Sequence, residues 1–240
     1  RDMVDMEPAL ARELWHRLEV VNAVAYFSPE CRDAATRLGL RGFWMGYFAS
    51  RAAPMGSVGA GVVEATFFNF HPERVRRAIP DAWELVDAAD IVVARSQAAS
   101  MALRRILTDE HAEGLAALVV PAARAAIDLA GDEGRPLFGA NRDVPLPTDP
   151  VAALWQAATT LREHRGDGHV ALLTSAGLDG CEVHVLFAAA ENVPSELYQS
   201  SRGWSADDWA SASSRLADRG LLDDRGMPTI AGRQLRAEIE

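Results

Sequence analysis

The segment SADDWASASSRLADRGLL, residues 205–222, decides the fold of the C-terminal part of this chain. Trp209, Ala212 and Leu216 recur at the spacing of one helical face, so the segment predicts a helix with a single apolar stripe. Gly220 is typical of the position that ends a helix.

The residues that follow, DDRGMPTIAGRQL at 223–235, predict a wing. Asp223 to Gly226 is typical of a tight turn between two short strands, which we expect at 221–222 and 227–230. A closing helix is expected over 231–240. A helix, a β-hairpin and a second helix in this order are typical of the winged-helix end of a helix-turn-helix fold.

This end of the chain resembles the MarR-type winged-helix family. The resemblance rests on Leu216, on RGLL at 219–222 and on TIAGRQL at 229–235, and it covers about residues 191–240. It implies a winged-helix fold and a DNA-binding transcriptional regulator.

The whole chain also resembles a helix-turn-helix family of actinobacterial proteins that has no established activity. The segments that carry this resemblance are GFWMGYFASRAAP at 42–54 and LREHRGDGH at 161–169. It implies a fold and no particular chemistry.

The charge of the chain argues against DNA binding. Its 240 residues include 24 basic and 34 acidic side chains, a net charge of −10, whereas a nucleic-acid binder needs a basic face. The predicted recognition helix begins with Ser-Ala-Asp-Asp-Trp, and residues 192–240 hold six arginines against eight acids. DNA is therefore a disfavoured partner, and a MarR-like regulator with contacts from a dimer is the alternative function.

Helical periodicity continues through most of the remaining chain. We expect an N-terminal winged-helix-like unit with long helices at 1–130, a linker loop rich in Pro, Gly and Asp at 131–150, and the MarR-like unit at 151–240. The predicted fold class is mostly α, with two tandem winged-helix-like helical units and a small C-terminal β-hairpin wing.

The sequence also suggests that the two units arose by duplication. Leu14-Trp15 recurs as Leu154-Trp155, and GLRG at 39–42 recurs as GLDG at 177–180, at nearly the same spacing. Ordered landmarks at a near-constant spacing are typical of an internal repeat.

The segment REHRGDGH at 162–169 is the first candidate site. We expect it at a corner between a helix that ends at Glu163 and one that begins at His169. His164, Asp167 and His169 could be metal ligands. The spacing of the two histidines does not fit one helical face and no cysteine is near, so no metal is expected.

Three other roles for this segment remain open. Glu163, His164, Asp167 and His169 are the catalytic candidates of an acid–base site, in which a histidine works with a carboxylate near neutral pH. Arg165 beside glycines suits an anion. The third possible role is purely structural: the segment would form a corner in which Asp167 caps the next helix.

Aromatic residues concentrated in the N-terminal third form the second candidate site. An apolar aromatic pocket with a few polar groups is typical of a small-molecule site. The candidates here are His16, Tyr26, Trp44, Tyr47, Asn69 and His71. We expect them to line one cavity between the two units together with His164, Arg165 and His169.

The predicted function is therefore binding of a small aromatic or apolar molecule between the two units. A cofactor-independent enzyme that uses residues 163–169 is the third reading, and the prediction leans away from an enzyme. No nucleotide-binding or hydrolase motif occurs, so no cofactor is expected.

The remaining expectations concern location and partners. No apolar run is long enough to span a bilayer and the acidic N-terminus does not read as a secretory signal, so we expect a cytoplasmic protein with no membrane partner. A homodimer is left open. Cys31 and Cys181 lie in apolar helical surroundings and are expected to be buried structural residues.

Overall fold

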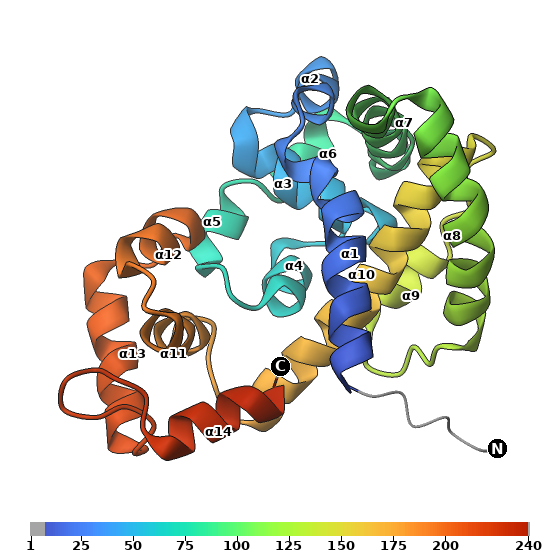
Figure 1. The fold of residues 1–240 in the computed structure, drawn as a ribbon. Helices are drawn as coiled ribbons and strands as arrows, with labels where there is room; N and C mark the ends of the chain where they lie inside the picture. The colour runs from blue at the N-terminus through green and yellow to red at the C-terminus, as the bar shows by residue number, and fades with distance from the viewer. Residues whose placement is uncertain (1–7, 240) are drawn as a thin grey trace. The chain divides into compact units, whose positions relative to one another are not determined.

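The computed structural model describes residues 8–239, and almost all of the regular structure in this range is helical (Figure 1). The elements are α1 (Pro8–Phe27), α2 (Pro29–Arg37), α3 (Gly42–Ala52), the short 3-10 helix η1 (Ala53–Met55), α4 (Ala60–Phe67), α5 (Pro72–Arg76), α6 (Asp81–Leu85), α7 (Ala88–Leu107), α8 (Asp109–Leu129), α9 (Pro136–Arg142), α10 (Pro150–Ser175), α11 (Glu182–Glu191), α12 (Ser195–Arg202), α13 (Ala206–Asp218) and α14 (Ile230–Ile239).

Local sequence explains where many of these helices begin and end. The Ser28 hydroxyl accepts the Cys31 N–H at the start of α2, and the following Pro29 suits the first helical position. Ser205 and Asp208 form a reciprocal capping box at the start of α13. Gly39, after α2, has a φ of +84°, a backbone conformation that favours glycine.

The chain forms two compact units by its internal contacts. Unit 1 extends to Ser57 and resumes over Asp81–Gly166, and unit 2 combines Val58–Pro80 with the chain from Asp167 onward. This division differs from the predicted one, because the segment 131–150 lies within unit 1 and α10 passes from one unit into the other. The predicted linker also contains a helix, α9.

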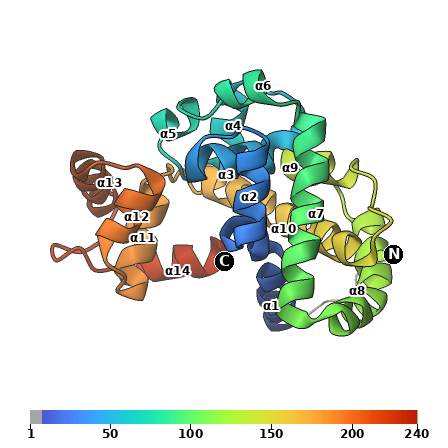
Figure 2. The same cartoon turned by 90° about the horizontal axis from the view of Figure 1, so that it is seen from above.

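Unit 1 is built around α7. α7 packs against α1, α2, α3 and α8, and α2 and α7 lie side by side in both views (Figures 1 and 2). The segment 81–107 forms two helices, α6 and α7, with Asp87 before the first turn of α7. The first half of α10 contributes Val151 and the buried Trp155 to the core under α7.

Unit 2 contains two helices joined by a short turn, α12 and α13, which is the geometry of a helix-turn-helix. α11 packs against α12, α13 and α14 (Figure 2). α12 and α13 are joined by a turn in which Gly203 has a φ of +90°. Leu186, Leu216 and Ile239 belong to its core. The apolar stripe predicted for α13 is confirmed, because Ala212 and Leu216 are fully buried.

The predicted β-hairpin wing is wrong. Within residues 8–239 there is no β-strand, and the turn after α13 is closed by one isolated bridge between Leu222 and Pro228. Pro228 has no N–H to donate, so a ladder cannot continue through it. The Asp223 carboxylate instead accepts the N–H groups of Arg225 and Met227. The mostly α class is confirmed.

The predicted corner at 162–169 is also wrong, because this segment lies inside α10, a continuous helix of 26 residues. Each glycine in a helix costs roughly 1 kcal/mol relative to alanine. Buried residues on both sides of the glycines, such as Leu154 and Leu173, anchor the two ends of the helix in packed cores.

The predicted duplication stays a prediction. Gly39 and Gly177 each come after a helix, and both have a positive φ, as the repeat would require. Leu14, however, is about half exposed, at 49%, whereas its predicted counterpart Leu154 is fully buried. None of the helices in the described part of the chain combines the length and apolarity that a membrane crossing requires.

Candidate functional site

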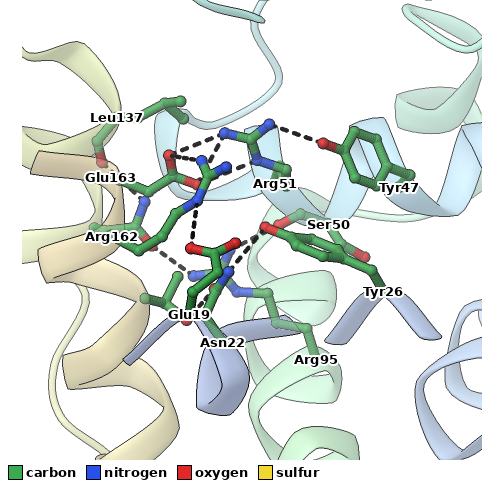
Figure 3. Close-up of polar contacts among 12 residues, drawn as sticks. Glu19, Asn22, Tyr26, Tyr47, Ser50, Arg51, Arg95, Leu137, Arg162 and Glu163 are labelled. Carbon is green, nitrogen blue, oxygen red and sulfur yellow. Dashed lines mark hydrogen bonds and ion pairs between the residues drawn. The ribbon is translucent and has the colours of Figure 1, made fainter. Parts of the chain in front are cut away.

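A buried ion cluster lies in unit 1 where α3 meets α10 (Figure 3). Arg51 on α3 contacts both carboxylate oxygens of Glu163, with Nη2 2.9 Å from Oε2 and Nε 3.2 Å from Oε1. Arg162 donates to the same Glu163 Oε2 at 2.9 Å, and its Nε lies 3.5 Å from Glu19 of α1. The side chains of Arg51 and Glu163 are only 10% and 2% exposed.

The two arginines keep Glu163 ionised despite its burial. Burial alone raises the pKa of the carboxyl, but the charges of Arg51 and Arg162 outweigh it and lower the pKa to about 2. Conversely, burial lowers the pKa of Arg51, and the Glu163 carboxylate more than restores it, so the Arg51 pKa lies well above its ordinary value. The cluster is therefore fully charged near neutral pH.

A third arginine, Arg95 on α7, is buried beside this cluster. Its guanidinium donates to the Ser50 carbonyl at 2.7 Å, to Asn141 Oδ1 at 2.8 Å and to Gln156 Oε1 at 3.2 Å. It lies over the Trp155 ring, 5.2 Å from the centroid. Burial lowers the pKa of Arg95 to about 10, so the group is still protonated near neutral pH.

Two adjoining hollows open next to these groups, both within unit 1. The outer hollow has a volume of about 200 Å³ and lies between α2, α3 and the C-terminal end of α1. The side chains of Tyr26, Phe43 and Tyr47 form part of its lining. The inner one, of about 30 Å³, is lined by polar groups that include Arg51 and Arg95. The residues that line both hollows are Ala25, Tyr26, Cys31, Ala35 and Ser50.

Tyrosine hydroxyls connect the aromatic walls to the ion cluster. Arg51 Nη1 donates to the Tyr47 hydroxyl at 3.0 Å, and Asn22 Nδ2 donates to the Tyr26 hydroxyl at 3.4 Å (Figure 3). The two rings are 5.1 Å apart. Burial raises the pKa of Tyr26. The Tyr47 hydroxyl is thus held by a charged guanidinium and the Tyr26 hydroxyl by a neutral amide.

Of the predicted site residues, Tyr26 and Tyr47 line the outer hollow, and Glu163 lines the inner one. Trp44 packs edge-on against Tyr47, with 5.7 Å between ring centroids. His16 lies on the exposed side of α1 beside the Trp15 ring.

Two further predicted residues of unit 1 lie away from these hollows. Arg165 stacks over Trp15, with 3.7 Å from its guanidinium carbon to the ring centroid. His164 packs edge-on against Phe138, and its carbonyl accepts a hydrogen bond from Arg135. Burial, followed by the charge of Arg135, lowers the pKa of His164.

The other predicted residues belong to unit 2. The Asn69 carbonyl accepts hydrogen bonds from Trp204 Nε1 and pairs with His184 Nε2, each at 3.1 Å. His71 begins α5, where its Nδ1 accepts the Glu73 N–H. His169 Nδ1 lies 3.3 Å from the carbonyl of Ile239, and Asp167 is buried. The acid–base and ligand roles of these residues remain predictions.

Sequence reasoning missed Arg51 and Arg95. Helical spacing could have shown Arg95, because Ile91, Ala98 and Ala102 mark the buried stripe of α7 and Arg95 falls on it. An arginine on a buried stripe needs polar partners. In the described part of the chain, no group of three or more His, Cys, Asp or Glu side chains could hold a metal ion.

In unit 2, the helix-turn-helix uses its arginines internally. Arg215 of α13 contacts Asp179 at 2.5 Å and Glu182 at 2.8 Å. Arg219 donates to the carbonyls of Gly177 and Ala176. The N-terminal turn of α13 presents the exposed Asp207.

The order of α12, a short turn and α13 is that of a helix-turn-helix motif. The chain belongs to a helix-turn-helix family, whose model matches residues 11–240. This match supports the broader of the two resemblances and is not specific to the MarR type. No curated protein and no solved structure matches the chain.

Proposed function

We propose that unit 1 binds a small aromatic molecule in the outer hollow between α1, α2 and α3. The observation that carries this proposal is a hollow of about 200 Å³ with the rings of Tyr26, Phe43 and Tyr47 in its wall. For comparison, a dry apolar cavity of about 150 Å³ binds benzene. The size therefore suits a ligand with one ring and a small substituent.

The wall of the hollow suits such a ligand chemically. Aromatic rings prefer edge-to-face or offset contacts with one another, and buried tyrosine hydroxyls seek hydrogen-bond partners. Tyr47 and Tyr26 already have partners on their protein side, Arg51 and Asn22. Their rings are thus held in fixed positions, which reduces the entropy lost on binding.

The test is calorimetric titration of the full chain with toluene, phenol and benzoate. We expect at least one of them to bind the wild type and to raise its melting temperature. Ala35→Leu places a larger side chain in the wall shared by both hollows, and it should abolish this binding. Ala117→Leu is the matched control, because Ala117 is exposed on α8. Failure of all three compounds to bind would overturn the proposal.

Membership of a helix-turn-helix family favours a DNA-binding regulator as the second candidate function. The geometry of α13 counts against strong binding, because Arg215 already pairs with Asp179 and Glu182. A DNA phosphate would have to compete with these two carboxylates. Asp207, near the start of the helix, would repel it.

We therefore expect no saturable binding to a mixed-sequence duplex at low salt, where phosphate contacts are strongest. Fluorescence anisotropy of a labelled duplex measures this directly. Binding that weakens steeply as salt is added would instead favour the regulator. A repeat of the measurement with the small-molecule probes present distinguishes a regulator that requires a ligand from a protein that does not bind DNA.

A further inference from the structure

Unit 1 buries more positive than negative charge next to its aromatic hollow. Arg51, Arg95 and Arg162 supply three guanidinium groups, whereas Glu163 and Glu19 supply two carboxylates. Both carboxylates contact Arg162, and Glu163 also pairs with Arg51. Among the described residues Arg95 has no carboxylate within ion-pair distance, and Glu163 acts on it only through its charge. The ion cluster is therefore neutral, and together with Arg95 these groups carry one positive charge in excess.

Arg95 is the group that carries this excess. Its described contacts are all neutral: the Ser50 carbonyl, the side-chain oxygens of Asn141 and Gln156, and the Trp155 ring. Its Nε is buried and has no hydrogen-bond partner. The residue is 6% exposed. A buried charge without a counter-ion is destabilising, and a buried donor left unpaired adds to the cost.

The inner hollow lies beside this guanidinium. Arg95, Arg51, Ser50 and Thr159 contribute to its wall, and its volume of about 30 Å³ is enough for a water molecule or a small polar group. A carboxylate is planar and matches the fork of a guanidinium, whereas a tetrahedral phosphate needs more room. The inner and outer hollows share five residues and therefore adjoin, so a ligand that reaches both has its ring and its carboxylate only a side-chain layer apart.

We propose that the ligand of unit 1 is a small aromatic monocarboxylate, with its ring in the outer hollow and its carboxylate against Arg95 in the inner one. This inference rests on the proposed function and specifies the chemical class of its ligand. The carboxylate supplies the missing counter-charge and an acceptor for the unpaired donor. The ring fills the space between Tyr26, Phe43 and Tyr47.

The experiment compares benzoate with benzamide, which has the same shape and no charge, by titration of the full chain at neutral pH. We expect benzoate to bind about tenfold more tightly or better, as a charge-assisted hydrogen bond in a buried site provides. Arg95→Gln should remove most of this preference and leave benzamide binding nearly unchanged. Arg124→Gln is the matched control, because Arg124 is exposed on α8 and lines neither hollow.

The outcomes separate the two proposals. Equal affinity for benzoate and benzamide would contradict the proposed carboxylate ligand but would still be consistent with an aromatic pocket. If benzoate, phenol and toluene all fail to bind, the proposed pocket itself is wrong. If Arg95→Gln does not fold, measurements on the wild type still test the proposal. Chloride that competes with benzamide, together with equal affinity for benzoate and benzamide, would indicate a site for an inorganic anion and would contradict the proposed carboxylate ligand.

Discussion

Glu163 is the residue on which the buried cluster of unit 1 depends. It pairs with both Arg51 and Arg162, and the Arg51–Glu163 pair is buried, whereas Arg162 is partly exposed and also contacts Glu19. A buried ion pair contributes little compared with a well-packed apolar pair, but removal of one partner leaves the other charged and unsolvated. The cluster therefore fixes how α3 packs on α10 more than it adds stability.

Glu163→Gln should destabilise unit 1 by about 3–5 kcal/mol, because the buried guanidinium of Arg51 loses its carboxylate partner. Urea unfolding at neutral pH measures this change. Glu73→Gln is the control: Glu73 pairs with Arg77 on the surface, and its loss should change the stability very little. A small effect of Glu163→Gln would mean that water reaches the cluster.

At the scale of elements, the segment after α10 approaches the chain before α5 closely. A Cβ added at Gly180 would lie 2.3 Å from the carbonyl oxygen of Phe68, which belongs to the same unit. The polar link beside it joins the Asn69 carbonyl to Trp204 and His184. A glycine at this position lets α4 and α5 pack against the helix-turn-helix.

Gly180→Ala should therefore destabilise unit 2 by roughly 1–3 kcal/mol, since backbone atoms must shift to admit the methyl group. Thermal unfolding followed by circular dichroism provides the measurement. Gly114→Ala is the matched control, because nothing lies near its added Cβ in the middle of α8. That change should stabilise the protein by up to about 1 kcal/mol. Equal effects of the two changes would contradict the close approach.

The whole molecule should respond to acid in two separate pH windows. Burial, followed by the charge of Arg202, lowers the pKa of His184 in unit 2 from 6.5 to about 4. The unfolded chain therefore binds more protons than the folded one between these values, and stability is lost as the pH falls through them. Glu163 in unit 1, with its pKa lowered from 4.5 to about 2, contributes stability that is lost only below about pH 4.5.

Urea unfolding at pH 7 and pH 4.5 tests the first window. The wild type should lose up to roughly 3 kcal/mol between the two, and His184→Gln should lose much less, because glutamine does not titrate. Hydrogen exchange should locate the loss in residues 182–218. Identical losses in the wild type and the variant would assign the acid sensitivity to another group.

Sequence by itself determined the helices of this protein. Caps such as Ser28 and Ser205, and apolar stripes such as that of α13, act over a few residues and can be recognised locally. Aromatic side chains concentrated in one region also predict a pocket that includes Tyr26 and Tyr47, and both line the outer hollow, while their role in binding stays a prediction. The same local reasoning failed at 162–169, where glycines suggest a corner but packing at both ends keeps α10 continuous.

Tertiary structure alone decided the rest. Arg51 and Glu163 are 112 positions apart, and no local pattern pairs them. The excess charge of Arg95 follows from which side chains surround it and not from its own sequence neighbours. The turn after α13 lacks strands because Pro228 and the Asp223 carboxylate take the place of a ladder. Periodicity reports which face of a helix is buried, whereas the groups that meet that face depend on the packing of distant segments.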